Sequence, residues 1–314
     1  MCDDNACILQ IPPNAAKDLR NMYNLDGPGR MEEAIDMLEK WIKQENHILK
    51  KDFNRGYLER ALLVNKGSVE MAKRRIDALC TIKTLTSHFF SINSTKEEII
   101  EALKVATVVP LPVPTKDLYR VVFVTVNDSN VSQHQLLLIM QYTTLIAEYL
   151  CRHDYINGIV FINDFQQLNL FGFLKNVDLM TQLRQYVSLA IRGYGMRIKG
   201  SHIVSQSKSA DFFSNLVKQF VSEKLLERTR VYKTVDELYD MILPRDNFPE
   251  DYGGKEKSVE KLTKAWVDTL FSNENMKYFK DMREARTDES LRSSGKFNSE
   301  YLGMPGSFRH LTVD

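Results

Sequence analysis

The sequence predicts an α/β protein in which a bundle of helices precedes a mostly parallel, twisted β-sheet with helices around it. Between residues 14 and 108, apolar residues recur at spacings of three and four, which is the spacing along one face of a helix. From residue 120, β-branched and aromatic runs alternate with helical segments, as in parallel strands joined by helical crossovers. The intervening segment 108–119 holds three prolines, which disfavour a helix and suit an extended connector.

The chain accordingly divides into three predicted parts. Residues 14–108 form an N-terminal bundle of four to five helices, residues 109–272 form the α/β domain, and residues 273–314 form a polar C-terminal tail. The tail is rich in Ser, Arg, Glu and Asp, so we expect order there only where something anchors it.

Local signals place the individual elements. In the bundle, Ser94 and Glu97 form a predicted capping box, and a second one is predicted at Ser132 and Gln135 in the α/β domain. The helix beginning near residue 29 carries one apolar face, formed by Met31, Ile35, Leu38 and Ile42. In the α/β domain we expect strands at 120–126, 157–164, 199–205 and 230–232, and helices at 132–152, 178–195, 209–228 and 234–243.

The composition is that of an ordinary soluble protein, with 43% apolar residues, 26% charged residues and a net charge of +1. A nearly neutral chain gives no bulk attraction for nucleic acid, so any anion site must be local. The four cysteines (Cys2, Cys7, Cys80 and Cys151) lack metal-ligand spacing and favour free thiols in a reducing compartment. The start of the sequence lacks the features of a secretory signal, and no apolar run is long enough to span a bilayer. We therefore expect a cytoplasmic protein.

Motifs of catalysis and cofactor binding are absent from the sequence. Gly193, Gly195 and Gly200 leave a predicted helix and enter a strand, which reverses the order that a dinucleotide site requires. There is no P-loop, no GxSxG nucleophile motif and no paired histidine spacing for a metal. His202 falls in the middle of a predicted strand and is interpreted as a satisfied core or wall histidine. We expect no enzymatic activity, no cofactor and no metal.

Apolar residues around the predicted strand 157–164 have two interpretations. The two-residue period of a strand places Ile159, Phe161 and Asn163 on one face. A sheet between helices is apolar on both faces, so this pattern alone is typical of a packed core. The predicted helix 209–228 adds Phe212, Phe213 and Phe220 after a polar linker, which suits a hinged lid over a cavity as well as a plain packing helix.

Two pairs of basic residues raise a similar choice. Arg197 and Lys199 are two apart on a predicted strand and share a face, and Lys224 and Arg228 are four apart on a predicted helix. Unaided, such pairs are typical of a solvated charged face.

The chain resembles the CRAL-TRIO lipid-binding family, in particular its branch of tocopherol-transfer and retinaldehyde-binding proteins and its arthropod members. The resemblance runs from about Arg55 to Trp266. It rests on the order of several short motifs, namely LER at 58–60, NGI before a strand that ends at Asp164, a strand containing Gly200 and His202, SEKLLER at 222–228 and FPEDYGG at 248–254.

The resemblance implies a helical N-terminal domain and an α/β domain that shelters one hydrophobic molecule under a movable lid helix, Lys208 to Val221. By matched position, the ligand-binding residues would be Leu138, Tyr142, Leu145, Ile159, Phe161, Asn163, Leu183, Tyr186, Leu189, Ile198, Phe212, Phe213, Leu216 and Val217. Asn163 and Tyr186 are the candidates for the polar end of the ligand. The phosphoinositide-binding residues would be Arg60, Arg197, Lys199, Lys224 and Arg228. The family's Gly-Trp pair after the central strand is replaced by Gln167 and Leu168, so its contacts to a phenolic headgroup do not transfer.

The function that this resemblance implies is that of a monomeric, non-enzymatic carrier. It would hold one tocopherol-, retinoid- or carotenoid-like lipid and exchange it with phosphoinositide-containing membranes, associating with them peripherally and without nucleic acid. Two alternatives remain: an enzyme that modifies a lipid, and a non-transferring scaffold whose cavity is filled by its own side chains.

Overall fold

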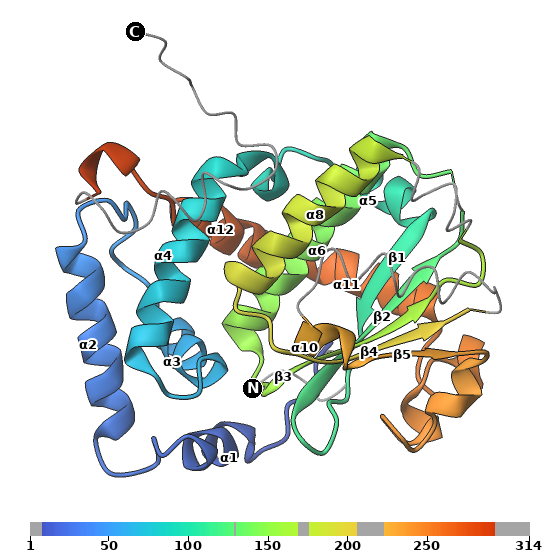
Figure 1. The fold of residues 1–314 in the computed structure, drawn as a ribbon, viewed down its shortest axis with the longest axis horizontal. Coiled ribbons are helices and arrows are strands. Elements are labelled where there is room, and N and C mark those ends of the chain that lie inside the picture. Colours follow the sequence, from blue (N-terminus) through green and yellow to red (C-terminus); the bar gives the residue numbers. More distant parts are fainter. Residues whose placement is uncertain (1–7, 129, 169–175, 206–222, 293–314) are drawn as a thin grey trace, which may run out of the picture.

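The computed structural model describes residues 8–128, 130–168, 176–205 and 223–292. Its centre is a five-stranded sheet in which the spatial order of the strands follows the chain (Figure 1). The first two strands are antiparallel and the remaining pairs are parallel. The strands are β1 Ala106–Pro110, β2 Tyr119–Val126, β3 Gly158–Asp164, β4 Ile198–Val204 and β5 Thr229–Tyr232.

Helices precede the sheet, connect its parallel strands and follow it. The α-helices are α1 Ala15–Met22, α2 Arg30–Gln44, α3 Arg55–Val64, α4 Val69–Leu85, α5 Lys96–Leu103, α6 Gln133–His153, α8 Val177–Arg192, α10 Glu223–Leu226, α11 Val259–Leu270 and α12 Asn273–Met282. The short 3-10 helices are η1 Ser87–Phe90, η2 Val235–Leu238, η3 Arg245–Asn247, η4 Glu250–Tyr252 and η5 Glu289–Leu291. The predicted class, an α/β fold with N-terminal helices and a mostly parallel sheet, is confirmed. None of the helices in the described ranges is both long and apolar enough to cross a bilayer.

The N-terminal helices α1 to α4 share one buried cluster. On α2 the predicted face, Met31, Ile35, Leu38 and Ile42, is buried. The capping box before α5 lies one residue later than predicted, at Thr95 and Glu98, because Ser94 instead donates a hydrogen bond to Gln141 on α6, 2.8 Å away.

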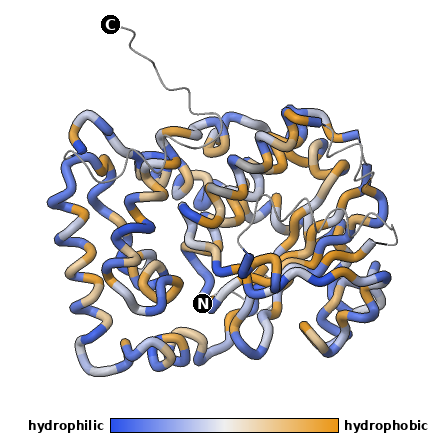
Figure 2. The backbone as a smooth tube through the Cα atoms, in the orientation of Figure 1, coloured by the Kyte–Doolittle hydropathy of each residue, from blue (hydrophilic) through white to orange (hydrophobic). Residues whose placement is uncertain are grey.

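Helix α6 connects these helices to the sheet. It contacts α3, α5, α8 and β1, and its predicted capping box at Ser132 and Gln135 is present. Figure 1 shows α6 and α8 side by side, with the sheet on one side of them and α2 to α4 on the other. Figure 2 shows hydrophobic residues concentrated along the strands, where most of the side chains of β2 and β3 are buried.

The proline-rich segment contains a strand as well as the predicted connector. Residues 106–110 pair with β2 to form the edge of the sheet, and Pro110 is the last residue of that strand, opposite Val122. An edge strand tolerates proline because the missing N–H faces no partner strand. The predicted boundary between residues 108 and 109 therefore falls inside β1.

The predicted helix 234–243 is reduced to the single 3-10 turn η2. Thr234 and Glu237 form its capping box, but Tyr239 is extended and Asp240 has a φ of +59°, a left-handed conformation that ends a helix.

Residues 273–292 differ from the polar tail expected there. Helix α12 is held by its apolar side, with Phe279 and Met282 buried, and the segment after it crosses the N-terminal helices. There Thr287 pairs with Ile48, and the Arg292 guanidinium lies 2.9 Å from the Asp77 carboxylate. The polar composition of this segment hid its few buried contacts, so the tail does not begin at residue 273.

Candidate functional site

Four of the five predicted phosphoinositide-binding residues lie together in one cleft. Arg197 directly precedes β4 and Lys199 is its second residue, whereas Lys224 lies on α10 and Arg228 follows that helix. The cleft has a volume of about 430 Å³. We call it the basic cleft, and define it by its lining residues Val64, Asn65, Lys66, Met71, Arg75, Ile191, Gly195, Met196, Arg197, Ile198, Lys199, Lys224, Leu225 and Arg228.

An irregularity in the sheet positions the two cations of β4. Ile159 pairs with Ile198 and the next residue, Val160, pairs with Gly200, so Lys199 is the extra residue of a β-bulge. Gly158 makes the close approach possible, because a Cβ there would lie 2.6 Å from the Arg197 carbonyl oxygen. The Asn-Gly-Ile motif at the start of β3 thus has a physical role in placing these cations.

The cations of the basic cleft contact hydroxyl, carbonyl and aromatic groups. Arg197 donates to the Tyr23 hydroxyl at 2.7 Å, and that hydroxyl donates to Asn157 at 2.5 Å. The Lys199 ammonium lies 4.8 Å from the centre of the Tyr119 ring, and Arg228 donates to the Ile198 carbonyl at 2.7 Å.

Carboxylates are missing from this set of contacts. Within the described ranges, every ion pair closer than 4 Å lies elsewhere, and none involves Lys66, Arg197, Lys199, Lys224 or Arg228. Burial lowers the pKa of Lys199, and the positive charges of Arg197, Arg228 and Lys66 lower it further. An anion in the cleft would relieve this repulsion, and the phosphate group suits the guanidinium and ammonium donors present.

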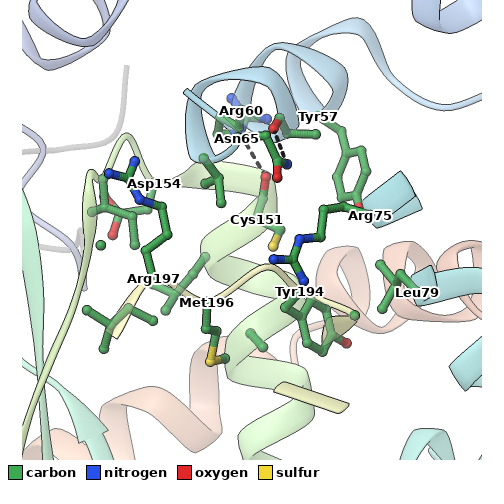
Figure 3. Close-up of a pocket in the computed structure, with 18 of the residues that line it drawn as sticks. Tyr57, Arg60, Asn65, Arg75, Leu79, Cys151, Asp154, Tyr194, Met196 and Arg197 are labelled. Carbon is green, nitrogen blue, oxygen red and sulfur yellow. Dashed lines mark hydrogen bonds between the residues drawn. The ribbon is translucent and has the colours of Figure 1, made fainter. Parts of the chain in front are cut away.

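Arg60, the fifth predicted cation, lies in a neighbouring pocket. Its guanidinium donates to the Cys151 carbonyl at 2.8 Å and stacks on the Tyr155 ring, 5.3 Å from the ring centre. We call the space beside it the seam pocket, because it lies where α3 and α4 meet α6, the start of β3 and the segment after α8 (Figure 3). Its volume is about 80 Å³ and its wall is mainly apolar.

The predicted ligand-binding residues are distributed over three places. Leu138, Tyr142, Leu145 and Ile159 are buried in one cluster between α6 and the sheet, with Phe161 packed against it. Leu183, Tyr186 and Leu189 of α8 belong to a second cluster with α4 and η1. Ile198 lines the basic cleft. Four others, Phe212, Phe213, Leu216 and Val217, lie outside the described residues together with the rest of the predicted lid.

The polar members of this set differ in how they are satisfied. Asn163 contacts the Ser201 hydroxyl at 3.3 Å and the His202 carbonyl at 3.4 Å, so its amide already has protein partners. Burial raises the pKa of Tyr186, whose hydroxyl bonds to Thr144 and Thr143. Tyr142 is fully buried, and its hydroxyl has no hydrogen-bond partner in the part of the chain that the structure describes.

His202 lies in the sheet as predicted. Its Nδ1 is 3.2 Å from the Tyr232 hydroxyl, and burial lowers the pKa of its imidazole to about 4. The described residues contain no group of three or more His, Cys, Asp or Glu side chains that could hold a metal ion.

The sequence did not point to two cations of the cleft, Lys66 and Arg75. It also did not point to Tyr23, whose hydroxyl contacts Arg197. Lys66 lies in the turn between α3 and α4 with a φ of +58°, and Arg75 lies on α4 and donates to the carbonyls of Ile191 and Arg192 at 2.9 Å. Tyr23 ends α1. No local pattern distinguishes these residues, because they meet β4 only through the packing of the N-terminal helices onto the sheet.

Comparison with known proteins now identifies this architecture. Residues 106–254 match the sequence profile of the CRAL/TRIO domain, a span that contains all five strands and the cations of β4 and α10. Residues 106–254 form a domain of the CRAL-TRIO family. Lys66 and Arg75 come from helices that precede the matched CRAL/TRIO domain.

Individual relatives match only part of the chain. The alpha-tocopherol transfer protein-like protein of Mus musculus is 24% identical over 133 residues, and that of Homo sapiens is 23% identical over 134 residues. These matches cover 42% and 43% of this chain and 38% of each relative, so the chain spans less than two fifths of the relatives it matches. The crystal structure of Sfh5 superposes with a TM-score of 0.48 at 10% identity, covering 83% of this chain and 98% of that one.

Proposed function

We propose that the protein is a cytoplasmic, non-enzymatic carrier that holds one hydrophobic molecule and exchanges it with membranes containing phosphoinositides. In this proposal it acts as a monomer and associates with the membrane peripherally. The observation that supports exchange with phosphoinositide membranes is the basic cleft. There, cations from two separate segments converge without a carboxylate within ion-pair distance in the described residues. The match to the CRAL/TRIO domain supports the proposal that the protein holds one hydrophobic molecule.

Phosphoinositide headgroups suit this cleft for electrostatic reasons. Like charges brought together without counter-ions raise the energy of the empty protein, and a multiply phosphorylated headgroup neutralises several of them at once. Each Lys or Arg near an anionic membrane contributes roughly 1 kcal/mol of attraction. Docking of Arg197, Lys199, Lys224 and Arg228 on a headgroup is therefore favourable and declines with salt.

The energetics of a hydrophobic cargo are compatible with exchange. Burying a chain of about 20 methylenes is favourable by roughly 0.8 kcal/mol each, on the order of 16 kcal/mol relative to water. A bilayer offers nearly the same gain, so transfer between protein and membrane is close to neutral. Binding of a headgroup in the basic cleft then biases release, with the predicted lid 208–221 as the moving part.

The Tyr142 hydroxyl is a candidate contact for a polar end of the cargo. A buried hydroxyl without a partner costs about 1 to 3 kcal/mol, and a ligand carbonyl or hydroxyl would remove that penalty. We expect Tyr142→Phe to weaken binding of a ligand with a polar end by about 5- to 150-fold, measured by fluorescence titration, and to leave a pure hydrocarbon unaffected. Equal losses for both ligands would exclude this contact.

Native mass spectrometry of the purified protein, followed by solvent extraction, tests whether the protein holds a hydrophobic molecule. We expect one apolar molecule per chain, which extraction would also identify. A protein that carries nothing and takes up no lipid from vesicles would contradict the proposal and favour a filled scaffold. A lipid that returns chemically altered would favour a lipid-modifying enzyme.

A further inference from the structure

The seam pocket and the basic cleft are neighbours with a common wall. They share Val64, Asn65, Arg75, Met196 and Arg197. Figure 3 shows four of these side chains around the seam pocket, with Arg197 and Met196 on the side opposite α3. A molecule whose charged group lies in the cleft therefore has an apolar space beside that group.

Several polar groups at the edge of the seam pocket already have partners. Besides Arg60 and Arg75, which donate to backbone carbonyls, the Asp154 carboxylate is paired with Arg120 at 2.8 Å. The Asn65 amide donates to the Ala61 carbonyl at 2.8 Å. Burial raises the pKa of the Cys151 thiol to about 12, which keeps the thiol neutral and apolar. These partners reduce the number of sites in the pocket that could hold water.

The size of the seam pocket fits a short hydrocarbon segment. Its volume of about 80 Å³ is several times the ~10–15 Å³ that one water molecule requires, and about half of the ~150 Å³ of an apolar cavity that binds benzene. A wall of Ile76, Leu79, Leu150 and Ile159 suits two or three methylene groups.

We propose that the seam pocket receives the apolar segment next to the phosphorylated headgroup, so that the two spaces bind one anionic amphiphile. The ligand class is a phospholipid with a phosphorylated headgroup, held by its phosphates in the basic cleft and by the first carbons of one acyl chain in the seam pocket. This inference rests on the proposed phosphate site and adds that the protein distinguishes a whole lipid from a free headgroup.

Calorimetric titration of the full chain tests the proposal with two soluble probes. One is inositol 1,4,5-trisphosphate, and the other is phosphatidylinositol 4,5-bisphosphate with six-carbon acyl chains, used below its micelle concentration. Each buried methylene strengthens binding by about fourfold. We expect the short-chain lipid to bind about tenfold or more tightly than the free headgroup. Equal affinities would overturn the proposal, and this comparison requires no variant.

A variant that fills the pocket locates the apolar segment. Ala61→Leu adds bulk to the wall from α3 and should reduce the lipid preference to about twofold or less without changing the affinity for the headgroup. Ala16→Leu on α1, a half-buried alanine that lines neither space, is the matched control. A preference that persists in Ala61→Leu would place the acyl chain elsewhere and contradict the proposal.

The phosphate site and the seam pocket can be refuted separately. If neither probe binds, the phosphate site of the proposed function is wrong. If the headgroup binds and the acyl chains add nothing, the phosphate site stands and the seam pocket does not take part.

Discussion

The molecule contains two groups of cations that differ in how their charge is compensated. Arg120 is fully buried and lies 2.8 Å from both oxygens of Asp154, and Lys83 lies 2.5 Å from Glu148 in a similarly dry place. Four cations of the basic cleft, Arg197, Lys199, Lys224 and Arg228, are half-buried or exposed, and none of them forms an ion pair with a carboxylate of the described residues. Complete pairing indicates a structural role, and missing pairing indicates that an external anion completes the site.

The first way to test this contrast is to break a buried pair. Asp154→Asn leaves the Arg120 charge buried without a counter-charge, so we expect a loss of about 3 to 5 kcal/mol in the free energy of unfolding. Urea denaturation measures this loss. Asp268→Asn is the control, because the exposed pair of Asp268 with Lys96 contributes only about 0 to 1 kcal/mol. Equal losses for the two variants would contradict the assignment of Arg120 as structural.

Charge reversal in the cleft should weaken anion binding and leave the free energy of unfolding nearly unchanged. We expect Lys224→Glu with Arg228→Glu to weaken binding of inositol trisphosphate by about 30-fold or more, since each lost cation removes roughly 1 kcal/mol. The free energy of unfolding should change by less than about 1 kcal/mol, because no ion pair is lost. Lys257→Glu with Lys264→Glu imposes the same change in net charge outside the cleft and controls for bulk electrostatics. Weakening of similar size in that control would remove the cleft from the account.

Tyr23 provides a smaller test of how the cleft is positioned. Tyr23→Phe removes the hydroxyl that accepts the hydrogen bond of Arg197, so we expect headgroup affinity to fall about 3- to 10-fold and stability by about 1 kcal/mol. Calorimetry measures the affinity. Tyr155→Phe removes a hydroxyl beside Arg60 in the seam and should leave headgroup affinity unchanged. A loss of stability without a loss of affinity would reduce Tyr23 to a packing residue.

His202 tests whether the protein interior disfavours a positive charge that has no counter-charge beside it. Because burial lowers the pKa of folded His202 to about 4, the unfolded chain binds its proton first, near pH 6.5. Stability from this residue is complete above about pH 6.5 and is lost as the pH falls toward 4. On the order of 1 kcal/mol separates pH 7.5 from 5.5 after allowance for partial exposure.

The measurement is urea denaturation at both pH values. We expect His202→Gln to reduce the difference, whereas the exposed His134→Gln should not. A difference that is unchanged in His202→Gln would assign the acid sensitivity to other groups.

The sequence was sufficient for features that depend on local pattern. The β-branched runs of β2 and β3 and the apolar face of α2 predicted these elements, because a strand or helix with one buried side must repeat with its own period. The grouping of Lys199 with Lys224 and Arg228 came from family resemblance, since periodicity alone paired them only within their own elements.

Features that depend on packing between distant segments were not predictable. The seam pocket joins α3 to the segment after α8, more than 120 positions apart, and no motif marks either side of it. Helix α12 was hidden in a polar composition because only two of its buried side chains, Phe279 and Met282, are apolar. Pro110 argued against a regular element, yet it ends an edge strand.

The most direct test of the carrier account is the rate at which loaded protein transfers a fluorescent hydrophobic ligand to vesicles, with and without phosphatidylinositol 4,5-bisphosphate. We predict that the phosphoinositide accelerates transfer by the wild-type protein and that Lys224→Glu with Arg228→Glu abolishes this acceleration while ligand loading stays intact. Equal acceleration in the wild-type protein and the variant would contradict the account.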